Sequence, residues 1–248
     1  MYRFLFDLDD TLVDNMFMKY ILPEVSRKIA DIAGMDPEII RRMIIDENIR
    51  RLKSGLYVEA FDWDDIITRV QASIGVGDPV LFSDEAIKFS RMASPKPGVK
   101  EVLRRIKSEE GRISLVTNGF LSYVLPILSR AGIIEFFDRI VTPDQTGYIK
   151  PMPEIFLAAV DRNEKIVHVG DSVSLDICGA RRAGFDSALI MEIPPTLSEL
   201  DPMRRVYAVA GLIRKKFEIE TYSFLVEGPC LPSYLITDIR ELLHLIQR

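Results

Sequence analysis

Short apolar runs punctuate the chain, and amphipathic segments separate them. The runs YRFLF (2–6), ISLV (113–116), IVHVG (166–170) and SALIMEI (187–193) have the length and composition of buried strands, and RIVT (139–142) can add another. Helical patterns lie between the later runs, one behind Pro97 and one before Gly184. Strands that alternate with helices predict an α/β fold, a doubly wound parallel sheet with helices on both faces.

The pattern changes over residues 15–92, where helical periodicity dominates. Asp36 followed by Pro37 predicts a helix start and Gly55 its end, and a second helix is expected over 83–92. We therefore predict a catalytic core made of 1–14 and 93–248, with a helical cap domain of 15–92 inserted after the first strand. Its two connections would act as hinges for a lid.

Residues 194–232 have the weakest pattern. Asp201 followed by Pro202 predicts the start of a helix. Its expected apolar stripe consists of Met203, Val206, Tyr207, Ala210, Ile213 and Phe217. The run TYSFLVE (221–227) alternates like a strand, and residues 233–248 resume a strand-and-helix pattern. We expect this additional segment to form a contact between copies of the chain, as in a homo-oligomer.

The composition is that of an ordinary soluble globular protein, with 48% hydrophobic and 28% charged residues. A net charge of -5 argues against nucleic acid or an anionic membrane as the main partner. No apolar run approaches the roughly 18 residues of a membrane span, and the first residues lack the features of a secretion signal. We therefore expect a cytoplasmic protein that acts on small molecules.

Polar residues follow three of the predicted strands, at the point where each strand ends. Asp7 and Asp9 follow the first, Thr117 and Asn118 follow ISLV, and Asp171 follows IVHVG. The carboxyl ends of parallel strands meet at one edge of a sheet, where α/β folds bind their ligands. We expect these side chains to gather there.

Four aspartates at this edge, Asp7, Asp9, Asp171 and Asp176, would repel one another unless a cation joined them. An all-oxygen set without histidine or cysteine suits Mg²⁺ better than Zn²⁺. Because Mg²⁺ is usually held by one or two carboxylates plus substrate phosphate, the set indicates a phosphorylated substrate. Phosphoryl transfer needs a nucleophile, a proton donor and groups that hold the phosphate, and the chain offers carboxylates, a hydroxyl and a lysine.

Four motifs, in this order, resemble those of the haloacid dehalogenase-like superfamily. They are DLDDTL at 7–12, LVTNG ending at Gly119, KPMPEIF from Lys150, and GDSVSLD at 170–176. The resemblance covers the first strand and residues 95–193, and the closing PSYLITDIRELLHLI is in keeping with it. It implies a Rossmann-like core, Mg²⁺ as cofactor, and a small helical cap between the first two motifs.

The resemblance also assigns roles to the aspartates. Asp7 is implied as the nucleophile and a metal ligand. Asp9 is implied as the general acid, and later the base for the attacking water, with its backbone carbonyl also on the metal. Asp171 would bind Mg²⁺. Asp176 would either bind the ion directly or orient it without touching it, through the direct ligands.

Three further residues complete the implied site. Thr117 and the amides near Asn118 would bind the phosphate, while Lys150 would balance the charge of Asp7 and the phosphate. True dehalogenases of this family lack the second aspartate of the first motif, so Asp9 favours phosphorus chemistry. The resemblance thus implies a phosphatase that hydrolyses a small phosphorylated metabolite through an aspartyl phosphate.

Three alternatives stay open. A phosphomutase has the same motifs and differs only in its product. A phosphonate hydrolase would need a cap lysine that forms a Schiff base, for which Lys19, Lys53 and Lys88 are candidates. A non-enzymatic phospho-acceptor, like a signalling receiver domain, also uses an aspartate, a threonine and a lysine, although the cap and the acid Asp9 argue against it. No pattern in the cap identifies the substrate.

Several other residues have a structural interpretation. His168, in an apolar run, is expected to be a packed and hydrogen-bonded core residue, and His244 to lie on the polar side of the last helix. The acidic run FDWDDII (61–67) predicts a helix start rather than a metal site, with Trp63 packed in the core.

Two more groups carry no expected chemistry. Cys178 and Cys230 match neither a disulfide framework nor a metal motif, so we expect Cys178 to behave as a small buried hydrophobe and neither thiol to be catalytic. Arg50, Arg51 and Lys53 are expected on a solvated helix face rather than against an anionic substrate.

Overall fold

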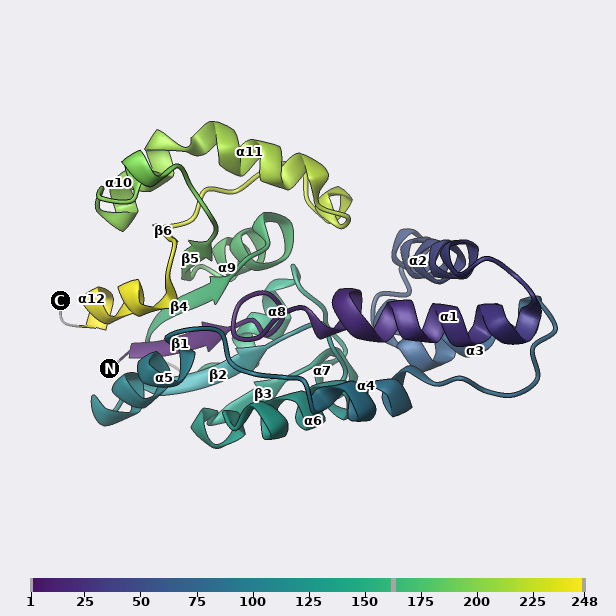
Figure 1. The fold of residues 1–248 in the computed structure, drawn as a ribbon. Coiled ribbons are helices and arrows are strands. Elements are labelled where there is room, and N and C mark those ends of the chain that lie inside the picture. The colour runs from purple at the N-terminus through teal and green to yellow at the C-terminus, as the bar shows by residue number, and fades with distance from the viewer. Residues whose placement is uncertain (1, 162–163, 247–248) are drawn as a thin grey trace.

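The computed structural model describes residues 2–161 and 164–246, and its centre is one parallel sheet. Within those residues six strands lie in the order β3-β2-β1-β4-β5-β6, every neighbouring pair parallel (Figure 1). The strands are β1 Tyr2–Phe6, β2 Arg112–Val116, β3 Arg139–Val141, β4 Lys165–Gly170, β5 Asp186–Ile190 and β6 Tyr234–Ile236. The order runs outward in both directions from β1, which confirms the predicted doubly wound α/β fold.

Helices cover both faces of the sheet, because side chains along a strand alternate between the two faces. Phe4 and Phe6 of β1 pack in one hydrophobic cluster, whereas Leu5 belongs to another on the opposite face. The first cluster includes side chains of α5 Val99–Ser108 and α6 Leu121–Ala131, and the second those of α8 Pro153–Leu157 and α9 Cys178–Arg182. Two short helices, α7 Pro143–Thr146 and α12 Leu243–Ile246, complete this part.

A group of helices lies beyond the carboxyl end of β1, at the right of Figure 1. It comprises the π-helix Phe17–Ile21, α1 Leu22–Ala33, α2 Pro37–Lys53, α3 Trp63–Ser73 and α4 Phe82–Ser90. As expected, the Asp36 carboxylate accepts a hydrogen bond from the Glu38 N–H, 2.7 Å away, at the start of α2. The Asp62 carboxylate accepts one from the Asp65 N–H, 3.1 Å away, at the start of α3. These helices cover the edge where the strands end, and we call them the helical roof.

The two connections to this helical group run side by side. Val13 and Pro95 form an isolated antiparallel bridge, and the Lys96 N–H donates to the Leu12 carbonyl at 2.8 Å. The Lys96 ammonium group also donates to the carbonyl of Asp10. The chain therefore enters and leaves the helical group next to the first motif.

The additional segment differs from the sequence prediction. It forms two helices, α10 Pro202–Ala208 and α11 Ala210–Ile219, which separate at Val209. Because of this break, Val206, Val209 and Ile213 are buried, whereas Met203 is 50% and Tyr207 is 79% exposed. The stripe expected on one continuous helix is therefore wrong at Met203 and Tyr207.

The expected strand at 221–227 is also wrong, because a 3-10 helix, Ser223–Leu225, occupies its centre. Leu225 and Tyr222 pack against the main hydrophobic cluster instead of pairing with a strand. No helix within 2–161 and 164–246 is long and apolar enough to cross a membrane.

Cys178 and Cys230 form a disulfide, which corrects the sequence interpretation of Cys178 as a simple buried hydrophobe. Their Cα atoms lie 5.2 Å apart although 52 residues separate them along the chain. The additional segment leaves the sheet after β5 and returns past α9 before β6, so folding alone brings the two thiols together. The spacing of the two cysteines in the sequence does not predict that they are close in space.

Candidate active site

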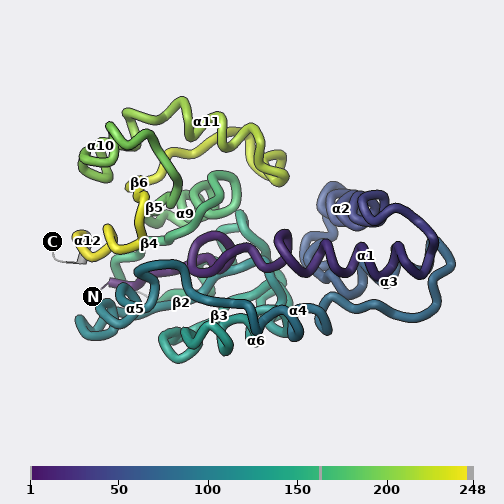
Figure 2. Tube along the Cα trace, in the orientation of Figure 1, coloured from purple at the N-terminus to yellow at the C-terminus, as the bar shows by residue number. Residues whose placement is uncertain are grey.

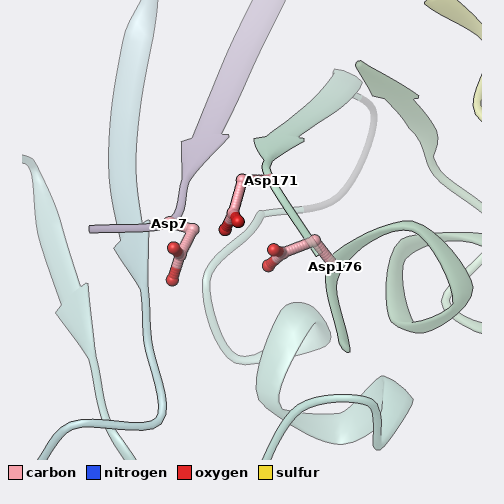
Figure 3. Close-up of side chains that lie close together, drawn as sticks. All are labelled: Asp7, Asp171 and Asp176. Carbon is pink, nitrogen blue, oxygen red and sulfur yellow. The ribbon is translucent and has the colours of Figure 1, made fainter. Parts of the chain in front are cut away.

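Three carboxylates converge at the carboxyl edge of the sheet (Figure 3). Asp7 follows β1, Asp171 follows β4, and Asp176 lies in the π-helix Val173–Ile177, which leads directly into α9. One carboxylate oxygen from each lies within 4.8 Å of the others. Asp7 and Asp176 are buried and Asp171 is half-buried. The positions that the sequence predicts from strand ends are therefore brought together in space.

Lys150 neutralises part of this cluster. Its buried ammonium group donates to Oδ1 of Asp7 and, at 2.8 Å, to Oδ1 of Asp176. Although burial lowers the pKa of Lys150, the charges of Asp176 and Asp7 raise that pKa above its ordinary value. Burial likewise opposes ionisation of Asp176, but Lys150 and a hydrogen bond from His168 lower the pKa of Asp176 below its usual range.

The pKa values of the other two carboxylates, Asp7 and Asp171, are raised instead. Burial raises the pKa of Asp7 well above its ordinary value. The positive charge of Lys150 offsets this rise only in part, and repulsion from Asp176 and Asp171 raises the pKa further. Burial, followed by the charge of Asp176, raises the pKa of Asp171 to about 7. Lys216 lies 3.8 Å from Oδ2 of Asp171 and lowers the pKa of that carboxyl in part, but two lysines still leave three carboxylates short of positive charge. An all-oxygen set of this kind fits a hard divalent cation, because such an ion restores the balance.

Asp9 lies beside this cluster rather than in it. Its half-buried carboxylate accepts a hydrogen bond from the Met16 N–H, 3.3 Å away, and it lines the same cavity as Asp7. Burial, with a smaller contribution from Asp10, raises the pKa of Asp9 to about 6. Asp10 itself is exposed, with a left-handed φ of 56°, and its carboxylate accepts a hydrogen bond from the Asn15 N–H.

Thr117 and Asn118 follow β2 and are buried in the same cavity wall. The Thr117 hydroxyl oxygen accepts a hydrogen bond from the Gly119 N–H at 3.2 Å, so its own proton stays available to a ligand. The Asn118 side chain accepts from the Lys150 N–H at 2.7 Å and donates to the Lys150 carbonyl at 3.2 Å. Asn118 therefore fixes the backbone from which Lys150 reaches the carboxylates.

A cavity of about 490 Å³ joins these groups to the helices above them. Its roof is rich in aromatic and aliphatic side chains, among them Phe17, Phe61, Trp63, Phe82, Ile21 and Ile45, and Tyr123 of α6 adds a further ring to the cavity wall. Arg41 of α2 also lines it, which the sequence did not single out. Trp63 is 5% exposed, as expected for a packed residue, and it also lines the cavity.

Arg51, by contrast, is buried in ion pairs with Glu47 and Asp65. Of the described residues that line the cavity, Lys150 is the one lysine, so Lys19, Lys53 and Lys88 do not face it. This placement removes the support for a Schiff-base lysine.

His168 contacts the candidate site, which its place in an apolar run did not predict. It is fully buried on β4, as expected for a core histidine, and its Nε2 lies 2.9 Å from Oδ1 of Asp176. Burial lowers the pKa of His168. The position of His168 in an apolar run predicted packing. It did not predict the contact with Asp176, which lies eight residues later, beyond the end of β4.

Comparison with known proteins identifies relatives of this chain. A family model for haloacid dehalogenase-like hydrolases matches residues 3–184. The glyceraldehyde 3-phosphate phosphatase of Methanocaldococcus jannaschii is 29% identical over 197 residues, which cover 76% of this chain and 84% of the relative. The phosphoglycolate phosphatase of Nitrosococcus oceani is 29% identical over 197 residues, covering 73% of this chain and 80% of the relative.

Solved structures show the same fold. A HAD phosphatase from Thermococcus onnurineus has a TM-score of 0.61 at 24% sequence identity, over 77% of this chain and 86% of that one. The L-2-haloacid dehalogenase of Xanthobacter autotrophicus has a TM-score of 0.62 at 16% identity, over 100% and 99% of the two chains. At these identities the likeness concerns the fold alone.

Proposed function

The chain belongs to the haloacid dehalogenase-like hydrolases and is a phosphatase of that family; from this premise we propose that it hydrolyses a small phosphate monoester through an aspartyl phosphate on Asp7, with Mg²⁺ as cofactor. The observation that carries the proposal is the convergence of Asp7, Asp171, Asp176 and Lys150 in one cavity, with Asp9 at its side. The relatives named as phosphatases of glyceraldehyde 3-phosphate and phosphoglycolate favour a small phosphorylated metabolite.

Asp7, Asp171 and Asp176 are the residues that would hold Mg²⁺. Their oxygen ligands suit this ion, and the raised pKa values of Asp7 and Asp171 mark a cluster that lacks positive charge. When bound, the ion supplies charge neutralisation for the carboxylates and for the phosphoryl oxygens. Lys150, which donates to Asp7 and Asp176, contributes further positive charge.

In the first step a carboxylate oxygen of Asp7 forms a bond to phosphorus, and the bond from phosphorus to the ester oxygen breaks. Asp9 gives its proton to that leaving oxygen, which departs as an alcohol. In the second step Asp9 takes a proton from water, the water oxygen bonds to phosphorus, and the bond to Asp7 breaks. The products are an alcohol and inorganic phosphate, and both aspartates return to their starting states.

Phosphate binding is assigned to Thr117 and to the backbone near Asn118. The Thr117 hydroxyl has a proton free for a phosphate oxygen, because its oxygen already accepts from the Gly119 N–H. The Asn118 side chain acts indirectly, because its amide oxygen and nitrogen both bond to the Lys150 backbone.

We further propose that residues 15–92 act as a cap domain over a core of 1–14 and 93–248. Support comes from the paired connections at Val13 and Pro95, and from the cavity that the helices share with the strand ends. Such a cap would exclude water during formation of the phosphoenzyme and open for release.

The test is a screen of phosphorylated metabolites with Mg²⁺, in which inorganic phosphate is measured and the Asp7→Asn protein serves as the blank. Steady release over many turnovers is expected from the wild type alone. An isomerised phosphate with little inorganic phosphate would identify a mutase instead. A stable phosphoprotein with one phosphate per chain would identify a phospho-acceptor.

A further inference from the structure

The additional segment 194–232 lies outside the region that the family model matches, 3–184, and yet it reaches the candidate active site. Its helices α10 and α11 pack on the edge of the sheet formed by β5 and β6, at the top of Figure 1. The end of α11 points toward α2, as Figure 2 shows. Three consecutive residues after α11, Glu220, Thr221 and Tyr222, line the cavity that contains Asp7.

On the core side, Glu220 holds the segment against the motif that carries Asp176. Its carboxylate accepts hydrogen bonds from the N–H groups of Val173 and Ser174, each at 2.7 Å, and from the Ser172 hydroxyl at 3.2 Å. A carboxylate at the beginning of a helix is favourable because the free N–H groups and the helix dipole both attract negative charge. The disulfide from Cys178 to Cys230 anchors the same region covalently.

On the opposite side, Tyr222 contacts the helical roof. Its hydroxyl donates to Oδ1 of Asn48 at 3.1 Å, and the buried Asn48 in turn donates to the Ala60 carbonyl at 2.6 Å. The Tyr222 ring lies 5.8 Å from the ring of Phe61, centre to centre. Phe61 lines the cavity as well, so the two rings form a continuous aromatic surface there.

The cavity therefore has three walls, from the strand ends, from the helices at 15–92 and from the additional segment. At the strand ends it is charged, whereas the surface facing them is mostly aromatic and aliphatic. Once the phosphate lies among the charged groups, the alcohol part of the ester must occupy the apolar part. A polyhydroxylated alcohol finds few partners there for its hydroxyl groups, chiefly Asn15 and Arg41, whereas an aromatic or apolar one buries surface favourably.

We propose that Tyr222 is a specificity-determining residue, and that the additional segment selects phosphate esters whose alcohol part has an aromatic or apolar face. This inference rests on the proposed function. It assigns to 194–232 a role within the chain's own active site, whereas a contact between copies of the chain stays a separate prediction, which a monomer in light scattering would contradict.

The test compares phenyl phosphate with glycerol 3-phosphate in the presence of Mg²⁺. The wild type is expected to prefer phenyl phosphate in kcat/KM. Replacing Tyr222 by leucine removes one ring of the wall, and loss of an aromatic contact lowers that preference by about tenfold. Tyr222→Phe keeps the ring, loses only the hydrogen bond to Asn48, and restores most of the preference. Tyr207→Ala is the matched control, because Tyr207 belongs to the same segment and is 79% exposed.

A binding measurement separates substrate selection from catalysis. Trp63, the single tryptophan of the sequence, lines the cavity, so its fluorescence reports binding of phenylphosphonate without turnover. The Kd is expected to rise about tenfold in Tyr222→Leu and to stay unchanged in Tyr207→Ala. Thermal unfolding of each variant establishes that it is folded, and Tyr222→Met replaces a leucine variant that does not fold.

The outcomes distinguish this inference from the proposed function. Phosphate release that depends on Asp7, together with an unchanged preference and Kd in folded Tyr222→Leu, overturns the inference and leaves the function standing. A wild type that prefers glycerol 3-phosphate also overturns the inference alone. Release that survives in Asp7→Asn overturns both. No release from either ester, with Asp7-dependent release from other metabolites of the screen, overturns the inference alone.

Discussion

Nε2 of His168 lies 2.9 Å from Oδ1 of Asp176, and both side chains are buried. The same carboxylate oxygen accepts a hydrogen bond from Lys150 at 2.8 Å, and Oδ2 accepts one from the Ser172 N–H at 3.0 Å, so three donors fix the orientation of Asp176 in the acidic cluster. A partner that orients a metal-binding carboxylate commonly changes metal affinity by about 10–100-fold when it is removed. We therefore expect His168 to act as a positioning residue of the candidate site.

We expect His168→Leu to weaken Mg²⁺ binding by about tenfold or more, because Asp176 loses one of its three hydrogen-bond donors. Titration calorimetry with Mg²⁺ measures this directly, without turnover. His168→Gln retains a donor and should recover part of the affinity, which a purely structural role for the ring would not produce. Equal Mg²⁺ affinity in His168→Leu and the wild type would contradict the prediction.

The three aspartates of the first motif should differ sharply in importance. Asp7→Asn removes the nucleophile and should lower kcat at least about a thousandfold, and Asp9→Asn removes the acid and should lower kcat by about 10²–10⁴-fold. Asp10→Asn is the matched control, because asparagine tolerates the left-handed φ of 56° at this exposed position. Its kcat should stay within about threefold of the wild type. A loss at Asp10 as large as at Asp9 would argue against these assignments.

Removal of divalent metal should abolish phosphate release, and added Mg²⁺ should restore it. Asp171→Asn should raise the half-saturating Mg²⁺ concentration at least about tenfold, since one charged oxygen ligand is replaced by a neutral one. Glu227→Gln, an exposed acidic residue of the additional segment, provides the comparison. Full activity after treatment with a chelator would rule out the metal-dependent reaction.

An ion-pair cluster in the helical roof predicts a pH-dependent stability. Hydrogen bonds from Arg50, and then from Arg51, lower the pKa of Glu47 from 4.5 to about 2. A carboxylate with a lowered folded-state pKa stabilises the fold above pH 4.5, and this contribution is lost as the pH falls toward 2. Glu47→Gln should therefore lower the free energy of unfolding at pH 7 by about 1 kcal/mol, and the difference from the wild type should shrink between pH 4.5 and 3.

Urea unfolding followed by circular dichroism at several pH values measures this difference. Glu38→Gln is the control on the same helix, because Glu38 pairs with Arg41 but its side chain is 61% exposed. A difference for Glu47→Gln that does not vary with pH would show that the ion pairs are not its source.

The disulfide predicts a redox-dependent stability. The cross-link between Cys178 and Cys230 spans 52 residues, and closing a loop of that length in the unfolded chain stabilises the fold by roughly 2–4 kcal/mol. Reduction of the wild type should lower its Tm, whereas the Cys178→Ser/Cys230→Ser double variant should have a low Tm with or without reductant. Equal Tm values for the reduced and oxidised wild type would contradict this expectation.

The sequence by itself determined the sheet and its reactive edge. The apolar runs at β1, β2, β3, β4 and β5 became adjacent parallel strands, because their hydrophobic pattern and the helices between them permit few other arrangements. Asp7 and Asp171 were predictable as neighbours for the same reason, since each directly follows a strand of that sheet. Helix starts such as Asp36 also followed from local pattern, because a capping side chain acts within a few residues of itself.

Tertiary structure decided the contacts between segments that are distant along the chain. Nothing local distinguishes Cys230 as the partner of Cys178, His168 as a donor to Asp176, or Tyr222 as a neighbour of Asn48. A periodic pattern encodes which face of an element is buried, but not which other element covers it. That choice depends on packing the whole chain into one core, and it therefore placed residues 220–222 of the additional segment against the candidate active site.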